Sequence, residues 1–248
     1  MSIVPESIEY HIAHIPTSIL MSLLVWVILL VLSLVVLKSF KYIPGKIQAA
    51  LEACFEYIFK LADESIGPEA YRYYPLFLGI FLYILVSNLI GLIPGLISPT
   101  SDPYVTVTLA LVVFIYYNFQ GFLKKGWGYL GHFFGPKLPW YMFPINILMF
   151  IIEMISNFAR PFSLAMRLFC NIFSKEILLG VLALLVLKFF FGNGPIEKAL
   201  TVGPLVLRPL ILLLGLMIGI IQALIFLVLT ISYVAGAVKS EDSGGHNV

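Results

Sequence analysis

The sequence contains very little charge. Only 11% of its 248 residues are Asp, Glu, Lys or Arg, whereas 60% are hydrophobic, and the mean hydropathy is +1.01. A water-soluble domain of this length needs far more charge to cover its surface. The composition therefore excludes a soluble globular protein and indicates an integral membrane protein.

The sequence also lacks the motifs of several chemistries. It has no GxxxxGK[ST] phosphate loop and no polar stretch long enough for a nucleotide-binding domain. Its two cysteines, Cys54 and Cys170, lie on separate predicted helices and form neither a disulfide framework nor a zinc site. The histidines lack the further ligands that a metal site requires: His11, His14, His132 and His246. We therefore expect no cofactor, no metal ion and no nucleic-acid partner, and we expect that the chain is not itself an enzyme.

Long apolar runs are what the sequence has instead. They approach or exceed the roughly 20 residues that a helix needs to cross a membrane, and they are continuous rather than alternating, which favours helices over a β-barrel. We predict one all-α membrane domain over residues 1–248, with five membrane-crossing helices and one inner-surface amphipathic helix, the last two crossings being long and steeply tilted as a hairpin. The predicted elements are span one at 19–37, the inner-surface amphipathic helix at 46–66, a helical pair at 75–97 and 104–123, and the hairpin at 142–191 and 200–237.

The predicted amphipathic helix has two distinct faces. Apolar residues recur at helical spacing on one face: Ile47, Leu51, Cys54, Phe55, Ile58, Leu61 and Ala62. The opposite face carries Gln48, Glu52, Glu56 and Lys60, which include a Glu-to-Lys pair four residues apart. Because so many charges exclude a membrane crossing, we expect this helix to lie along the inner membrane surface.

The last two apolar runs are too long for simple spans. As helices they would measure roughly 75 and 57 Å at 1.5 Å per residue, whereas the hydrocarbon core is about 30 Å thick and ordinary tilt averages about 20°. Each run must either break into several helices or lie steeply tilted. Pro161 could break the first run, but no turn-rich stretch surrounds it, and nothing like a loop interrupts the second. We favour the tilted hairpin, joined by an outer turn at residues 191–198.

Basic residues predict the orientation of the chain. Lys38, Lys124 and Lys239 each follow a predicted span, and the positive-inside rule places all three on the cytoplasmic side. Lys188 and Lys198 would then lie outside, against the rule. The first eighteen residues lack the basic start of a cleavable signal. We therefore expect the N-terminus outside and the C-terminus in the cytoplasm.

Ionisable residues inside the first long run form a polar seam. Such groups cost about 3 kcal/mol each at the membrane centre on insertion scales, and they are usually functional. Glu153, Arg160 and Arg167 are seven residues apart in turn, and seven steps on a helix drift by only about 20°, so all three share one face. Four uncharged polar residues lie close to the same stripe: Ser156, Asn157, Ser163 and Asn171.

Glu176 lies nine residues after Arg167, which is about half a turn around the helix. The arginine and this carboxylate therefore face opposite ways, as would suit one polar path entering the membrane and another leaving it. The alternative is that the charges pair within the bundle and only brace it. Arg167 has no acidic residue at i±3 or i±4 to neutralise it, so we favour a functional role for Arg167 and leave both interpretations open for Arg160.

Polar residues on other helices have two interpretations each. Gln222 could be an inter-helix hydrogen bonder, or it could face Arg167 across the hairpin, and Asn88 has the same two options. Gly215 and Gly219 form a small-xxx-small pair, which predicts close helix packing. Lys175 can extend outward toward water, and we assign it no role.

Four segments of the chain form a recognisable set. They are NLIGLIPG at 88–95, PTSD at 99–102, ARPFSLAMRLFCNIFSKE at 159–176 and IQALIFLVLTISYV at 221–234. Together they resemble subunit a of the F-type ATP synthase membrane sector, in its bacterial form. The resemblance implies a multi-pass, non-catalytic, ion-translocating subunit in the bacterial plasma (inner) membrane.

The resemblance also implies a mechanism and partners. In that family a long tilted hairpin packs against a rotating ring of c subunits, and two offset aqueous half-channels pass protons to and from the ring. The arginine that matches Arg167 faces the ring carboxylates. Other implied partners are the lipid bilayer and the b subunits of the peripheral stalk. We expect the inner-surface helix and span one to contact the b subunits. The candidate proton-translocation residues are Arg167, Glu176, Gln222, Asn171, Glu153, Arg160, Ser163 and Asn88.

Two positions depart from the family pattern. Cys170 stands where Gly commonly follows Arg-Leu-Phe, and Gly215 stands where the family often has a His or acidic residue to pair with the channel carboxylate. Lys175 beside Glu176 is also unusual. Glu176 therefore has no evident partner on the last helix.

Two other functions compete with this one. A secondary transporter or channel working alone would often show internal repeats and broken helices, and the chain shows neither. A scaffold subunit with purely structural charges is the second rival, and mutation of Arg167 would distinguish it.

Overall fold

The computed structural model describes residues 17–39, 45–93, 95–126, 143–191, 194 and 200–238. The α-helices in these ranges are α1 (Thr17–Ser39), α2 (Lys46–Ile66), α3 (Tyr74–Ile90), α4 (Pro103–Lys125), α6 (Phe143–Phe190) and α8 (Val202–Val238). Two 3-10 helices, η2 (Ala70–Arg72) and η3 (Pro99–Ser101), lie between them. The helices α1, α4, α6 and α8 are long and apolar enough to cross a membrane, and α3 is a shorter apolar helix. The predicted all-α membrane fold is confirmed.

Some predictions concern residues outside the described ranges. One is the outer turn at 191–198, most of which is not described. The others are Lys198 in that turn, Lys239 after the last helix, and the four histidines.

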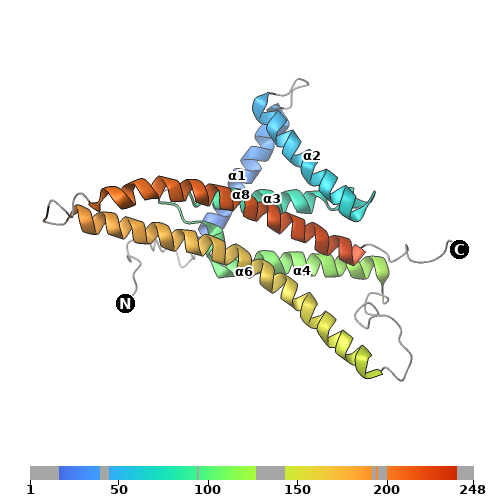
Figure 1. Ribbon diagram of the computed structural model, residues 1–248. Coiled ribbons are helices and arrows are strands. Elements are labelled where there is room, and N and C mark those ends of the chain that lie inside the picture. Colours follow the sequence, from blue (N-terminus) through green and yellow to red (C-terminus); the bar gives the residue numbers. More distant parts are fainter. Residues whose placement is uncertain are drawn as a thin grey trace.

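The helices α6 and α8 form the predicted hairpin and run antiparallel, side by side (Figure 1). With 48 and 37 residues, they measure about 72 and 56 Å at 1.5 Å per residue. Pro161 and Pro209 lie inside these helices without ending them. A proline removes only one backbone donor, and small local adjustments in a membrane helix can satisfy the freed carbonyl. Helices this long fit a hydrocarbon core of about 30 Å only when they are strongly tilted.

The second apolar segment ends earlier than the predicted range 75–97, because α3 stops at Ile90 and the chain turns back toward η3. A Cβ atom on Gly91 would lie 2.7 Å from Ser98 Cβ, so only glycine permits this close return. Gly95 has φ +94°, a left-handed conformation that also favours glycine. The turn brings residues 98–101 back into the bundle.

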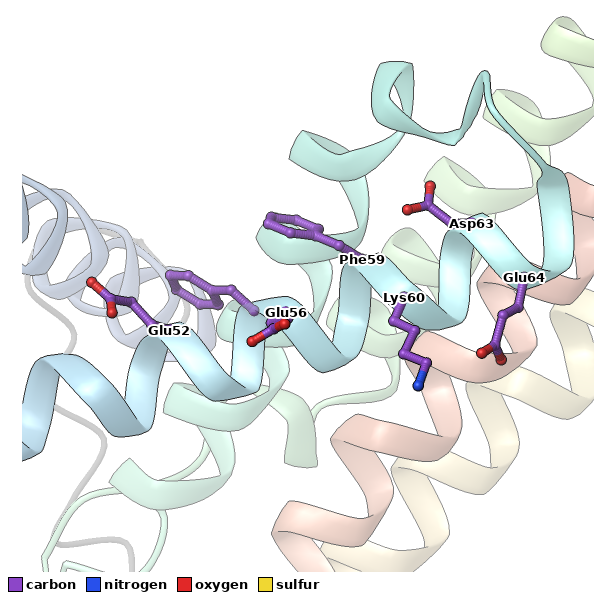
Figure 2. A pocket seen from close by; sticks show the side chains of 7 residues that line it. Glu52, Glu56, Phe59, Lys60, Asp63 and Glu64 are labelled. Atoms are coloured by element: carbon purple, nitrogen blue, oxygen red, sulfur yellow. The ribbon is translucent and has the colours of Figure 1, made fainter.

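The amphipathic helix α2 packs against α8 and α3 through its predicted apolar face. Ile58 and Ala62 on that face are completely buried. On the opposite face Gln48 donates a hydrogen bond to Glu52 at 2.7 Å. Glu52, Glu56, Lys60 and Glu64 follow one another at four-residue intervals and border a shallow hollow with Phe59 and Asp63 (Figure 2). The two-faced character predicted for this helix is thus present in the structure.

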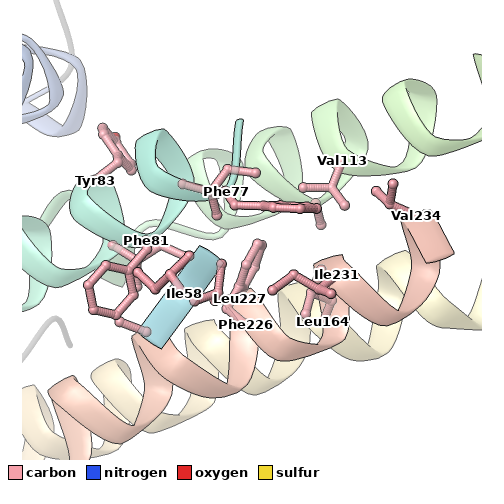
Figure 3. Close-up of a cluster of buried hydrophobic side chains, with 14 of the residues drawn as sticks. Ile58, Phe77, Phe81, Tyr83, Val113, Leu164, Phe226, Leu227, Ile231 and Val234 are labelled. Carbon is pink, nitrogen blue, oxygen red and sulfur yellow. The ribbon is translucent and has the colours of Figure 1, made fainter. Parts of the chain in front are cut away.

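The core lies where α3, α4, α6 and α8 meet (Figure 3). Phe77 of α3, Val113 of α4, Leu164 of α6, and Phe226 and Ile231 of α8 are all at most 2% exposed there. Lipid tails are as apolar as these side chains, so close van der Waals packing rather than transfer out of water holds the helices together. The core fixes the middle of α6 against α8, whereas the N-terminal end of α6 diverges from α8 (Figure 1).

Candidate functional site

Arg167 lies at the midpoint of α6, and its side chain is exposed. Leu164, Leu168 and Ile172 occupy successive turns of α6 and are buried in the bundle. They hold one face of α6 against the other helices, and Arg167 lies on the side that stays open. Within the described ranges, no carboxylate comes within ion-pair distance of its guanidinium. A permanently charged group at the middle of a membrane helix is therefore left open to a partner.

Asn171 lies one turn after Arg167 and connects the two helices of the hairpin. Its Nδ2 donates to Gln222 Oε1 at 2.7 Å. Gln222 is only 2% exposed, and its Nε2 has no hydrogen-bond partner among the described residues. Gln222 thus lies beside the turn of α6 that follows Arg167, and its hydrogen bond there is with Asn171.

Glu176 is half-buried, and its partners come from the segment before α4. The backbone N–H of Ser98 donates to Glu176 Oε1 at 3.3 Å, and the Ser101 hydroxyl donates to the Ser98 carbonyl at 2.8 Å. Arg167 and Glu176 therefore lie in different surroundings, as their half-turn separation predicts. The partner that the sequence does not reveal is supplied by residues 98–101.

Lys175 and Gly215 fit together across the hairpin. A Cβ atom on Gly215 would lie 2.8 Å from Lys175 Cδ, so the methylene stem of this lysine covers the glycine. Lys175 is therefore packed between helices rather than directed simply outward. The position where the family often has a large polar residue is filled by a side chain from the opposite helix.

Asn88 belongs to a buried polar network that joins three segments. Its Nδ2 donates to the Gly219 carbonyl of α8 at 3.0 Å, and its Oδ1 accepts from Thr100 Oγ1 at 3.2 Å. Ser98 Oγ lies 2.8 Å from Thr100 Oγ1 and donates to the Ser87 carbonyl at 2.9 Å. Of the two options for Asn88, inter-helix hydrogen bonding is the one that the structure shows. The same network fixes the segment that touches Glu176.

Glu153, Arg160 and Ser163 continue the polar seam toward the N-terminal end of α6. Arg160 Nη2 lies 3.8 Å from Glu153 Oε1, and its guanidinium lies 5.7 Å from the centre of the Tyr233 ring of α8. Both charged side chains are about one-third exposed and their closest atoms are 3.8 Å apart, so this is a loose pair. Ser163 is exposed on the same helix, one turn before Arg167. These residues follow one side of α6 without forming a closed cluster.

A second network was not anticipated from the sequence. Tyr117 of α4 donates to Asn157 Oδ1 at 2.7 Å, and Asn157 Nδ2 donates to Asn118 Oδ1 at 3.3 Å. The Tyr117 ring lies 5.8 Å from Tyr233, which connects this network to Arg160. Asn157 belongs to the polar stripe predicted from the sequence, whereas Tyr117 and Asn118 of α4 follow no periodic pattern that would connect them to it.

These features define a multi-pass α-helical membrane protein with ionisable side chains at membrane depth. The chain matches the family described as "ATP synthase A chain" over residues 19–235. It is 36% identical to ATP synthase subunit a from a Sulfurihydrogenibium species over 89% of this chain and 96% of that protein. It is 39% identical to ATP synthase subunit a of Aquifex aeolicus over 80% of this chain and 86% of that one. The corresponding protein of Geobacter sulfurreducens is 37% identical over 87% of this chain and 85% of its own length.

The chain therefore belongs to the ATP synthase subunit a family, as the sequence motifs indicated. It is a multi-pass membrane subunit of a bacterial ATP synthase and works in a complex with other subunits. Membership of this family argues against a transporter or channel that works alone.

Proposed function

We propose that this subunit passes protons between the two membrane faces and a rotating ring of c subunits, with Arg167 as the coupling charge between two offset half-channels. The observation that carries the proposal is the exposed Arg167 at the midpoint of α6, with no carboxylate near it in the described part of the chain. Charged groups at membrane depth normally pair or face a functional path. The missing carboxylate is then one that a neighbouring subunit brings.

The electrostatics of Arg167 give it a specific task. A guanidinium stays protonated at any accessible pH. It therefore stabilises an ionised ring carboxylate beside it and disfavours the protonated one. A ring carboxylate that reaches Arg167 must release its proton, and a carboxylate that leaves for the lipid must take one up. The fixed charge also repels protons that would pass directly from one half-channel to the other.

The two polar surroundings on α6 support separate paths on either side of Arg167. Glu176 faces residues 98–101, whereas Glu153, Arg160 and Ser163 lie toward the opposite end of the helix. In this proposal Glu176 serves the outer half-channel, and the seam that begins at Glu153 serves the inner one. A proton enters by one path, travels with the ring, and leaves by the other. Each charge that crosses supplies about 2.3 kcal/mol per 100 mV.

The hairpin residues between these paths have supporting roles. Asn171 and Gln222 join α6 to α8 one turn after Arg167, which holds the arginine at a fixed height against the ring. Asn88 ties α3 to the Gly219 carbonyl and to Thr100, so it sets the wall of the outer half-channel.

The positive-inside rule puts the N-terminus outside and the C-terminus in the cytoplasm, with α2 on the inner surface. The exposed apolar α1, which includes Trp26 at 60% exposure, and α2 are our proposed contacts for the b subunits.

The experiment is Arg167→Ala in the assembled complex, with Lys188→Ala as a control because it removes an exposed cation from the same helix. ATP-driven proton pumping and passive proton leak are measured in inverted membrane vesicles. Arg167→Ala is expected to abolish pumping without loss of assembly and to increase the leak, whereas Lys188→Ala keeps both at the wild-type level. Normal pumping by an intact Arg167→Ala complex would falsify the proposal. Loss of assembly alone would favour the scaffold function.

A further inference from the structure

A cleft of about 800 Å³ lies between α1, α3 and α4, away from the polar residues of α6. The helix α1 packs against α3 and η3, and it runs at a steep angle to α4 (Figure 1). The cleft therefore opens where α1 and α4 diverge over α3. Its volume is within the range of about 300–1,000 Å³ that is typical of sites for small molecules.

The lining of this cleft is mostly apolar, and its polar groups come chiefly from the beginnings of two helices. Ser18 and Ser22 belong to the first two turns of α1, and Asp102 caps the start of α4. Farther along the helices the lining includes Trp26, Leu109 and Val112. The cleft is therefore amphipathic, and its ligand is expected to have one polar end and one apolar end.

Asp102 is the one charged side chain among the described residues that line the cleft. Its Oδ1 accepts a hydrogen bond from the Tyr104 backbone N–H at 2.9 Å. Within the described ranges no lysine or arginine comes within ion-pair distance of it, and the side chain is half-buried. The negative charge of Asp102 is therefore not balanced by this chain, and it complements a cationic group on the ligand.

The depth of the cleft can be measured along α1. This helix has 23 residues, so it is about 34 Å long at 1.5 Å per residue, close to the hydrocarbon thickness of about 30 Å. The last residue of α1 that lines the cleft, Trp26, is about 14 Å from the start of the helix. The cleft thus covers about one leaflet. A membrane-crossing partner helix would need the full thickness, whereas the acyl chain of a lipid stays within one leaflet.

We propose that the cleft holds one phospholipid whose headgroup carries a primary ammonium group, a phosphatidylethanolamine. The ammonium pairs with Asp102 at the membrane face where α1 begins, and an acyl chain lies along the apolar lining. A primary ammonium donates charge-assisted hydrogen bonds to a carboxylate, whereas the headgroup of phosphatidylglycerol has no cation and is repelled. The lipid joins α1 to α4 across the gap between them.

Gly79 of α3 leaves room for the acyl chain. It lines the cleft, and no atom lies within 4 Å of a Cβ built on it. Other faces of α1 stay available at the same time, because Leu23 and Leu30 are 55% and 61% exposed and do not line the cleft. A partner helix can therefore pack on α1 while the lipid is bound.

The test is photolabelling of the assembled complex in vesicles of phosphatidylcholine. The vesicles contain a small fraction of phosphatidylethanolamine with a photoreactive group in its acyl chain, or of phosphatidylglycerol with the same chain. After irradiation, labelled peptides are identified by mass spectrometry. We expect label on α1 and α3, and roughly three- to tenfold more of it from the ethanolamine lipid, because the contact to Asp102 is charge-assisted.

Two variants separate the headgroup from the acyl chain. Asp102→Asn removes the charge but keeps a good helix cap, and it is expected to lower ethanolamine-lipid labelling to the glycerol-lipid level. Asp63→Asn is its control, because Asp63 also accepts one hydrogen bond, from Tyr74 at 2.6 Å, but lies on α2 outside the cleft. Gly79→Phe fills the cleft and is expected to lower labelling by both lipids. Gly180→Phe on α6, where a Cβ also has no atom within 4 Å, leaves labelling unchanged.

Equal labelling by the two lipids in the wild-type complex overturns the proposal, and so does ethanolamine-lipid labelling that Asp102→Asn leaves unchanged. Absence of label from α1 and α3 also overturns it and favours a partner helix as the occupant. The Asp102→Asn variant keeps the test decisive even if Gly79→Phe impairs assembly. None of these measurements depends on proton pumping, so their failure leaves the proposed function intact.

Discussion

The side-chain amide of Asn171 donates to Gln222 at 2.7 Å and joins the two hairpin helices one turn beyond Arg167. Gln222→Leu leaves this amide without its acceptor at the hairpin interface. One hydrogen bond contributes about 1 kcal/mol, so we expect pumping per assembled complex to fall roughly two- to tenfold. The double variant with Asn171→Leu is expected to lose little more, because both substitutions remove the same contact. Fully additive losses in pumping would show that the two residues act separately.

Gly215 and Gly236 give a matched pair of alanine substitutions on α8. Alanine is more favourable than glycine within a helix by up to about 1 kcal/mol. Nothing lies within 4 Å of a Cβ on Gly236, whereas a Cβ on Gly215 would lie 2.8 Å from Lys175 Cδ. We expect Gly236→Ala to raise the unfolding temperature in detergent and Gly215→Ala not to. When Gly215→Ala is combined with Lys175→Ala, the alanine at position 215 is expected to raise the unfolding temperature as Gly236→Ala does. An equal rise from Gly215→Ala and Gly236→Ala as single variants would show that the lysine stem does not fill this space.

Glu153 distinguishes a bracing role from a role in proton movement. Its distance of 3.8 Å from Arg160 is long for an ion pair, so we expect the pair to contribute little to stability. We expect Glu153→Gln to leave the unfolding temperature and assembly nearly unchanged and to lower proton pumping severalfold. Pumping and stability are measured on the same preparation. A fall in stability with normal pumping would support the bracing role.

Lys124 at the end of α4 donates a hydrogen bond to Glu69, which precedes η2. This contact and the charge of Lys124 lower the pKa of Glu69 below its usual value of 4.5. A lowered carboxylate pKa stabilises the fold above the usual pKa, and this contribution disappears as pH falls through the lowered value. Lys124→Ala is therefore expected to lower the unfolding temperature slightly at pH 7 and not at all in strong acid. High salt should reduce the effect, because both side chains are solvent-exposed, and Lys188→Ala serves as the control.

The helices and the polar seam could be predicted from the sequence because both follow from periodicity. Spacings of seven place Glu153, Arg160 and Arg167 along one side of a helix. The length of the last two runs, together with the lack of turn-rich stretches inside them, favours the hairpin. The structure keeps α6 unbroken through Pro161. The two faces of α2 were equally visible in the pattern of its charges.

Neighbours from distant parts of the chain could not be predicted in the same way. Ser98 and Glu176 are 78 residues apart, and no periodic pattern connects a backbone N–H in a turn to a side chain on a later helix. The fit of Lys175 over Gly215 depends on the path of a flexible stem, which spacing does not determine. Tyr117 and Asn157 likewise meet only after α4 packs on α6. Helical periodicity predicts which face a residue occupies, and packing decides what that face meets.

The location of Arg167 at the midpoint of α6 has a mechanical consequence. A helix much longer than the membrane is thick adapts to a thicker or thinner bilayer by a change of tilt. When a rod pivots about its centre, its ends change depth and its centre does not. If α6 is centred in the bilayer and tilts as a rod, the depth of the arginine changes least with bilayer thickness. Lipid composition then alters the length of the two paths that lead to the arginine more than the depth of the arginine itself.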